Sequence, residues 1–300
     1  MLLCKVLLGD DCMEMLMTIN HHYPKQKRLG SAAQPYQGWT PASDPFYYGY
    51  RTVAQTQPDG STHYQDLPLT QADFLDPQPG DRFTSSTVHT NIVYSLVTRF
   101  YAHYAGHPNE DWIGVFSKMK LCWGIPGEKE PMPDLMIVTD LKLPQHYRKT
   151  FSVQVEGTRP CLIVEVMSPF FPWDDTVKVD LYQRMGIAEY IIINPQAEEE
   201  GIATLVGYSL VEGAYHPIQP DPQGRLLSRT TDLWFALNQA KNNVILTNAI
   251  TGKQLLTTDE SYTALTEKRE VQKRLYAERQ RAEAAEAEVA RLRSLMASQG

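Results

Sequence analysis

The chain has 300 residues, of which 42% are hydrophobic and 21% are charged, and these ordinary values give a globular protein ample material for a core. Its formal net charge of −7 argues against a tight non-specific DNA binder, which would neutralise many phosphates with Lys and Arg, but it allows an enzyme with a local basic groove. The four cysteines lie far apart without a CxxC pair, which argues against a disulfide framework or a zinc knuckle and fits a reducing cytoplasm.

Residues 1–63 are predicted to form an irregular or flexible arm. The chain opens with an apolar run that meets Asp10 and Asp11 too early for a signal peptide, so we expect a protein that is not secreted. Residues 18–63 are rich in Tyr, Pro, Gln, Gly and His and lack apolar periodicity, so this segment is not expected to form regular elements. No run of the sequence is long enough to span a membrane.

The folded domain is predicted over residues 64–257 and begins with two helices. Thr70 is placed to cap a short helix through Phe74, which Pro77 would stop. The stretch SSTVHTNIVYSLVTRFYAHYAGHP predicts a longer helix that ends near Gly106, because its apolar residues recur at the spacing of one helical face. That face consists of Val88, Ile92, Val93, Leu96, Phe100 and Tyr104.

Four apolar runs predict buried strands, at residues 112–117, 135–140, 161–167 and 189–195. Between the third and fourth runs, DDTVKVDLYQRMG predicts a helix with Asp174 as its N-cap. The later stretch IATLVGYSLVEGAYHPI adds one or two strands at an edge. The order of helix, three strands, helix and strand predicts an α/β fold with a mixed central sheet flanked by helices.

Residues 258–300 are predicted to form a C-terminal coiled-coil helix. Residues 259–296 contain no Gly or Pro and are rich in Ala, Glu and Arg. A heptad seam runs through them, with Glu278 as its weak position, and we expect it to join copies into a homo-oligomer. A single solvated helix is the alternative, because several seam residues are small. The seam consists of Val271, Leu275, Ala282, Ala285, Val289, Leu292 and Met296.

A carboxylate interrupts the apolar run CLIVEVM. Glu165 must be paired, protonated or bound to a cation there, because burying a lone charge is very costly. Asp134 starts the preceding strand, and if the two strands are neighbours both carboxylates reach one end of the sheet, where their repulsion calls for a cation. Mg²⁺ suits these oxygen ligands, with the Val166 carbonyl as a third candidate. Lys178 in the next helix is placed to orient water, although a purely structural Glu165–Lys178 salt bridge is equally compatible with the pattern.

These residues resemble the Uma family of restriction endonucleases, which belongs to the PD-(D/E)xK nuclease superfamily. The resemblance rests on the Pro-Asp pair that ends at Asp134, on EVMSP from Glu165, on DDTVKVDLYQRM and on GIAEYIIINP, and it spans about 67–195. It implies an α-β-β-β-α-β core with Asp134 and Glu165 as metal ligands. Met167 stands where the superfamily has its lysine, and Lys178 matches the lysine that the Uma pattern carries on the following helix.

We therefore expect a Mg²⁺-dependent DNA endonuclease, with Mn²⁺ as an alternative metal. Its catalytic residues would be Asp134, Glu165 and Lys178, and its metal ligands Asp134, Glu165 and the carbonyl of Val166. The rival hypothesis is a nuclease-fold protein without turnover that acts as an oligomeric binding module, which the acidic charge, Met167 and the C-terminal helix favour. A structural coiled-coil adaptor is a third hypothesis.

Neighbouring residues are expected to have simpler roles. Asp174 is interpreted as an N-cap, Tyr182 as a packing residue, and His89 as a helix-start residue with a local hydrogen bond. Asp81 and His89 are the candidates near the position where the superfamily often carries a glutamate on its first helix.

The His103 and His107 pair has the spacing of helical zinc ligands, but the helix ends there and no glutamate follows His103, so we reject a zinc protease.

Overall fold

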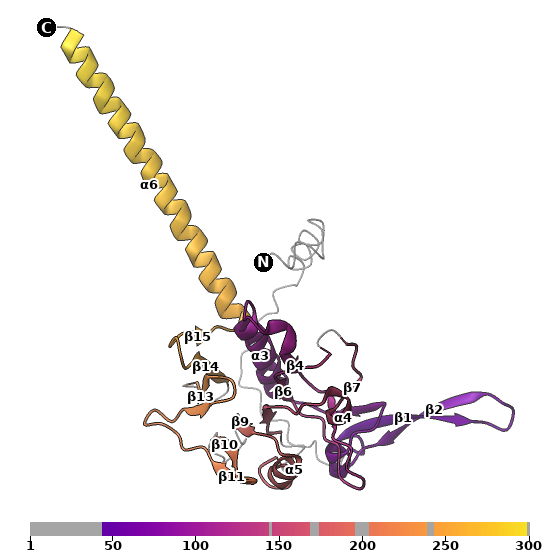
Figure 1. The fold of residues 1–300 in the computed structure, drawn as a ribbon. Coiled ribbons are helices and arrows are strands. Elements are labelled where there is room, and N and C mark those ends of the chain that lie inside the picture. Colours follow the sequence, from indigo (N-terminus) through magenta and orange to yellow (C-terminus); the bar gives the residue numbers. More distant parts are fainter. Residues whose placement is uncertain (1–43, 144–145, 169–173, 196–203, 239–242, 299–300) are drawn as a thin grey trace. The chain divides into compact units, whose positions relative to one another are not determined.

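A computed structural model describes residues 44–143, 146–168, 174–195, 204–238 and 243–298 of the chain (Figure 1). Residues 1–43 of the expected arm lie outside this part. Among the helices of the described residues, none has both the length and the apolar content that a membrane span requires.

The centre of the fold is a six-stranded mixed sheet with the strand order β11-β10-β9-β8-β6-β4. β8 and β9 run parallel, whereas every other neighbouring pair is antiparallel. The predicted mixed α/β architecture is confirmed, and the hairpin of β10 and β11 lies at one edge as expected. The strands are β4 (Gly114–Phe116), β6 (Leu135–Val138), β8 (Leu162–Val166), β9 (Glu189–Asn194), β10 (Thr204–Val211) and β11 (Ala214–Pro217).

The helices predicted over SSTVHTNIVYSLVTRFYAHYAGHP and DDTVKVDLYQRMG pack on opposite faces of this sheet. α3 (Thr87–Tyr104) buries Ile92, Leu96 and Phe100 in one apolar cluster, together with alternate residues of β6 and β8. α5 (Val177–Met185) buries its apolar side in a second cluster with the intervening residues of the same strands. This alternation explains why β6 and β8 are continuously apolar, because both of their faces are covered.

A four-stranded sheet that was not predicted from the sequence packs on the α3 side. It consists of β12 (Leu226–Ser228), β13 (Leu233–Leu237), β14 (Val244–Asn248) and β15 (Gln254–Leu255). Phe235 and Leu246 join the same apolar cluster as α3. The buried guanidinium of Arg99 donates from Nη1 to the carbonyl of Val244 at 2.6 Å, which ties α3 to this sheet.

Smaller elements cover the α5 side of the sheet. β5 (Lys120–Cys122) pairs in parallel with β7 (Thr150–Ser152), and the short helix α4 (Val153–Glu156) follows. Elsewhere in the chain, the 3₁₀ helix η2 (Glu110–Trp112) lies between α3 and β4. Leu121 and Phe151 bury their side chains in the cluster that α5 completes, so this layer closes the second core.

From residue 44 onward, the prediction of an irregular arm is wrong. β1 (Gly49–Thr56) and β2 (Thr62–Pro68) form an antiparallel hairpin, visible in indigo in Figure 1, and β3 (Asp81–Phe83) pairs with the other edge of β1. The hairpin is largely exposed, so its strands lack the apolar alternation that reveals half-buried strands. Pro58, Asp59 and Gly60 were the available turn signal between its strands.

Two further predictions concern helices. The short helix after Thr70 is confirmed as the 3₁₀ helix η1 (Gln71–Leu75), and the Asp73 carboxylate accepts hydrogen bonds from the Thr70 amide at 2.8 Å and hydroxyl at 2.7 Å. The C-terminal helix is present as α6 (Thr258–Ser298), with every side chain from 258 to 286 exposed. Its pairing with a second helix, which a coiled coil requires, stays a prediction.

Candidate active site

Strand register brings Asp134 and Glu165 together at one end of the sheet. Leu135 pairs with Val164 in the antiparallel β6–β8 ladder, so one step further Asp134 lies opposite Glu165, with both side chains on the same face. The Asp134 amide donates to Glu165 Oε2 at 3.2 Å, and the Val166 amide donates to Asp134 Oδ2 at 2.8 Å. Both carboxylates are almost fully buried, and each is held by the backbone that carries the other.

Lys178 reaches this pair from α5. Its ammonium lies 2.8 Å from Glu165 Oε1 and 2.8 Å from Asp174 Oδ1, and the Tyr182 hydroxyl donates to Glu165 Oε1 at 2.7 Å. A lysine on α5 therefore contacts the strand glutamate from the neighbouring helix. Met167 packs beside the apolar cluster on the α5 side.

The structure differs from two interpretations of the sequence. Asp174 is not the N-cap of α5, because the helix begins after Thr176, and its carboxylate is buried against Lys178. Asp174 therefore gives the buried ammonium of Lys178 a second carboxylate partner beside Glu165. Tyr182 does more than fill space, since its hydroxyl fixes a carboxylate oxygen of Glu165.

The structure adds two residues to the site. His89 Nε2 lies 3.0 Å from Asp134 Oδ2, and its Nδ1 lies 2.9 Å from the Ser85 hydroxyl, so this buried histidine does not make only a local contact. Lys118, in the turn after β4, places its ammonium on Asp134 Oδ1. Asp81, the other candidate considered near the first helix, is bound by the guanidinium of Arg51 at 2.8 Å.

The surroundings divide the acids into two electrostatic classes. Burial raises the pKa of Glu165, and it raises the pKa of Asp174 to about 7. Burial acts in the same direction on Asp134, but Lys118 and His89 outweigh it and hold the pKa of that carboxyl well below its usual range. Burial would lower the pKa of Lys178, yet its acidic neighbours raise it, so Lys178 stays protonated. Asp134 is therefore the persistently ionised acid of the site.

These groups line a cavity of about 370 Å³. Asp134, Glu165, Asp174 and both lysines line it. Its other lining residues are apolar side chains such as Phe74, Phe83 and Met132, and polar ones that include Asp81, Ser85 and His89. The charged cluster is thus accessible from a hollow although most of its members are buried.

The donor set fits a hard divalent cation. Among the described residues, no three His, Cys, Asp or Glu side chains are arranged to hold an ion by themselves. Two carboxylates and a backbone carbonyl would therefore need water or phosphate oxygens to complete the coordination, which is the usual habit of Mg²⁺. Asp134 Oδ1 faces Lys118, whose side chain is 47% exposed and can move away from it. The residues therefore suit a metal such as Mg²⁺.

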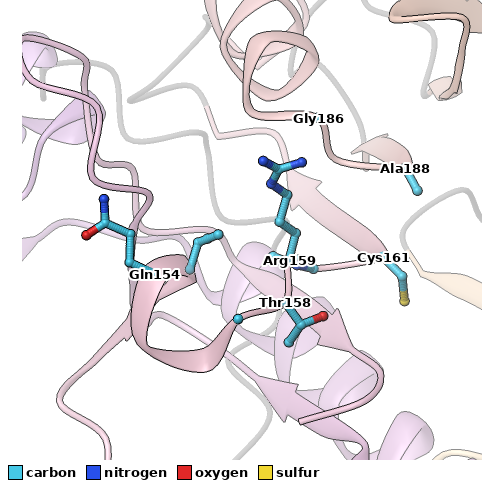
Figure 2. Close-up of a pocket in the computed structure, with 9 residues that line it drawn as sticks. Gln154, Thr158, Arg159, Cys161, Gly186 and Ala188 are labelled. Carbon is cyan, nitrogen blue, oxygen red and sulfur yellow. The ribbon is translucent and has the colours of Figure 1, made fainter. Parts of the chain in front are cut away.

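A second hollow, of about 610 Å³, lies at the opposite end of β8 (Figure 2). Gln154, Thr158, Arg159 and Cys161 border it, and the Arg159 side chain extends toward Gly186 at the end of α5. Among the described residues that line this hollow, none is acidic. It therefore offers no place for a carboxylate-bound metal, and the cavity at Asp134 is the candidate site.

Comparison with known proteins identifies a family for this chain. The sequence model of the family described as "Uma2: Putative restriction endonuclease" matches residues 80–240, more than half of the chain. Among solved structures, "a putative nuclease belonging to DUF820" from Anabaena variabilis is 15% identical, with 55% of this chain and 91% of that chain covered and a TM-score of 0.38. No curated protein matches the chain.

Proposed function

The chain belongs to the Uma2 family of restriction-type endonucleases, and from this premise we propose that it is a divalent-metal-dependent DNA endonuclease that hydrolyses phosphodiester bonds. The observation that carries the proposal is the position of Asp134 opposite Glu165, with the Lys178 ammonium 2.8 Å from Glu165 Oε1. Family membership supports a nuclease and implies a divalent metal. The metal dependence, the choice of Mg²⁺ and the roles of individual residues are our proposal.

The proposed ligands are the carboxylates of Asp134 and Glu165 and the carbonyl of Val166. When bound there, a divalent cation supplies a Lewis acid for a phosphate oxygen and for water. Lys178 stays protonated and lines the cavity, so its ammonium can position the attacking water and offset charge that develops on the phosphate. Tyr182 and Asp174 hold that ammonium and Glu165 in a fixed arrangement, so little reorganisation is needed when a substrate arrives.

Cleavage of supercoiled plasmid DNA tests this proposal. The wild-type chain should nick or linearise the DNA with Mg²⁺ or Mn²⁺ and be inactive in EDTA. Glu165→Gln and Asp134→Asn should each lower the rate by about 100-fold or more, as expected for lost transition-state stabilisation. The matched control is Asp111→Asn, which changes an exposed acid of η2 in the same way. Undiminished cleavage by Glu165→Gln under contamination controls would contradict the proposal.

The same experiment discriminates the rival hypothesis of a binding module. If the wild-type chain retains DNA in a filter-binding assay but leaves it intact with every divalent metal, a module without turnover is favoured. Calorimetry with Mn²⁺, repeated on Glu165→Gln, then shows whether the acidic pair still binds a metal.

We also propose that α6 joins copies of the chain into a homo-oligomer. Val271 and Leu275, at adjacent seam positions, have 54% and 60% of their surfaces exposed. A second copy of the helix would cover these apolar side chains, and seam contacts of this kind drive coiled-coil formation.

A further inference from the structure

Lys118 is a second lysine of the site and has a different setting from Lys178. It lies in the turn that follows β4, and its ammonium contacts Asp134 Oδ1. Among the described residues, Lys118 is the one whose cationic side chain contacts Asp134 Oδ1. The same lysine lines the cavity beside the acidic pair.

The backbone places Lys118 at this point. Phe116 pairs with Met136 in the antiparallel β4–β6 ladder, so two residues further along the register Lys118 lies opposite Asp134. The Lys118 amide donates to the carbonyl of Pro133 at 3.0 Å, and the Ser117 hydroxyl donates to the carbonyl of Asp134 at 2.7 Å. Lys118 adopts a left-handed φ of 51°, which a residue with a side chain rarely takes, so the turn is held in a specific conformation.

The two lysines differ in their freedom to move. Lys178 has 6% of its side chain exposed and lies between Glu165 and Asp174, so it cannot leave without stranding two buried carboxylates. The side chain of Lys118 is 47% exposed and contacts a single carboxylate oxygen. Water can therefore solvate its ammonium as soon as that contact opens.

We propose that Lys118 is an exchangeable counter-cation of Asp134: it occupies the carboxylate while no metal is bound, a divalent cation displaces it, and the released ammonium then binds a phosphate oxygen of the DNA in the same cavity. This inference rests on the proposed function, because it assigns Asp134 to the metal. It makes metal binding a competition between two cations for one oxygen, and it gives the displaced cation a use once the substrate is present.

Isothermal titration of the full chain with Mn²⁺, without DNA, tests the exchange. Lys118→Met removes the competitor, so we expect Mn²⁺ to bind about tenfold more tightly. This is the lower end of the roughly 10- to 100-fold changes in metal affinity that follow when groups around a metal ligand are mutated. The matched control is Lys120→Met, which removes the same charge from a position two residues further along the chain. The ammonium of Lys120 bonds Asp76 at 3.0 Å and not Asp134. An equal gain in both variants would indicate a general charge effect and overturn the exchange.

Cleavage with saturating Mn²⁺ tests the second half. Lys118→Met should cut DNA at least tenfold more slowly despite its tighter metal binding, and Lys118→Arg should recover most of the rate, because a guanidinium also binds phosphate. Unchanged Mn²⁺ affinity in Lys118→Met, with binding abolished in Glu165→Gln, would overturn this inference and leave the proposed function standing. Absence of Mn²⁺ binding to the wild-type chain would overturn both.

Discussion

Asp134 and Glu165 face each other across two neighbouring antiparallel strands, and the amide of Asp134 donates a hydrogen bond to Glu165 Oε2 at 3.2 Å. Two acids held this close need positive charge, and the chain provides a buried lysine for one and a half-exposed lysine for the other. The unequal settings of these lysines lead to separate expectations for stability and for metal binding.

Lys178 is expected to be essential for stability before any chemistry begins. Lys178→Met leaves Glu165 and Asp174 buried without their cation, which should lower the free energy of unfolding by about 3–5 kcal/mol. Urea denaturation without metal measures this loss. Lys273→Met, which breaks an exposed ion pair with Glu270 on α6, should change stability by less than about 1 kcal/mol. A comparably small effect at Lys178 would show that the buried cluster is not an obligatory ion pair.

Tyr182 is expected to hold Glu165 in place for its proposed role. Tyr182→Phe removes the hydroxyl that donates to Oε1, a hydrogen bond to a charged group worth about 1.5–3 kcal/mol. We expect a loss of stability of that order and Mn²⁺ binding about tenfold weaker, as for other groups that orient a metal ligand. Denaturation and calorimetry provide the two readouts. Tyr94→Phe, on the exposed side of α3, is the control. If Tyr182→Phe bound Mn²⁺ as tightly as the wild type, this result would count against the orienting role.

His103 is expected to make stability depend on pH. Burial lowers its pKa from the ordinary value of 6.5, although its Nε2 lies 3.1 Å from the carbonyl of Thr231. The folded state then binds fewer protons than the unfolded state, so the contribution of His103 is complete above pH 6.5 and is lost as the pH falls through its lower folded-state pKa. The stability difference between wild type and His103→Gln, measured by urea midpoints, should therefore shrink on acidification below pH 6.5. A difference that stays constant would refute this assignment.

The seam of α6 is expected to set the mass of the protein in solution. Wild type should sediment above the 34.1 kDa of one chain, and a Val271→Lys, Leu275→Lys double variant should sediment as a monomer. A control with Tyr276→Lys and Gln280→Lys introduces two lysines outside the seam and should keep the wild-type mass. A monomeric wild type would contradict self-association through α6.

The central architecture was predictable because its strands are short apolar runs covered on both faces. β8 and β9 carry this signal almost without interruption, and α3 shows its buried face at regular spacing. The exposed hairpin of β1 and β2 and the sheet of β12 to β15 carry weaker signals, because their strands are either solvated or very short. Their formation depends on pairing and on packing against other elements, which local sequence does not encode.

The site was predictable only in part for a related reason. Glu165 is conspicuous because a carboxylate interrupts an apolar strand, and Asp134 follows from its place at the start of the neighbouring strand. Lys118 depends on the register of β4 with β6, so nothing in its immediate sequence distinguishes it from other surface lysines. Asp174 was misplaced as a cap, because its burial against Lys178 emerges only when α5 packs on the sheet.

The most direct test of the metal proposal is a crystal of the full chain soaked in Mn²⁺ and measured for anomalous scattering. We predict one peak in direct contact with a carboxylate oxygen of Asp134 and one of Glu165, with the Lys118 ammonium moved off Asp134. A fully soaked crystal with its Mn²⁺ elsewhere, and with Lys118 still on Asp134, would contradict it.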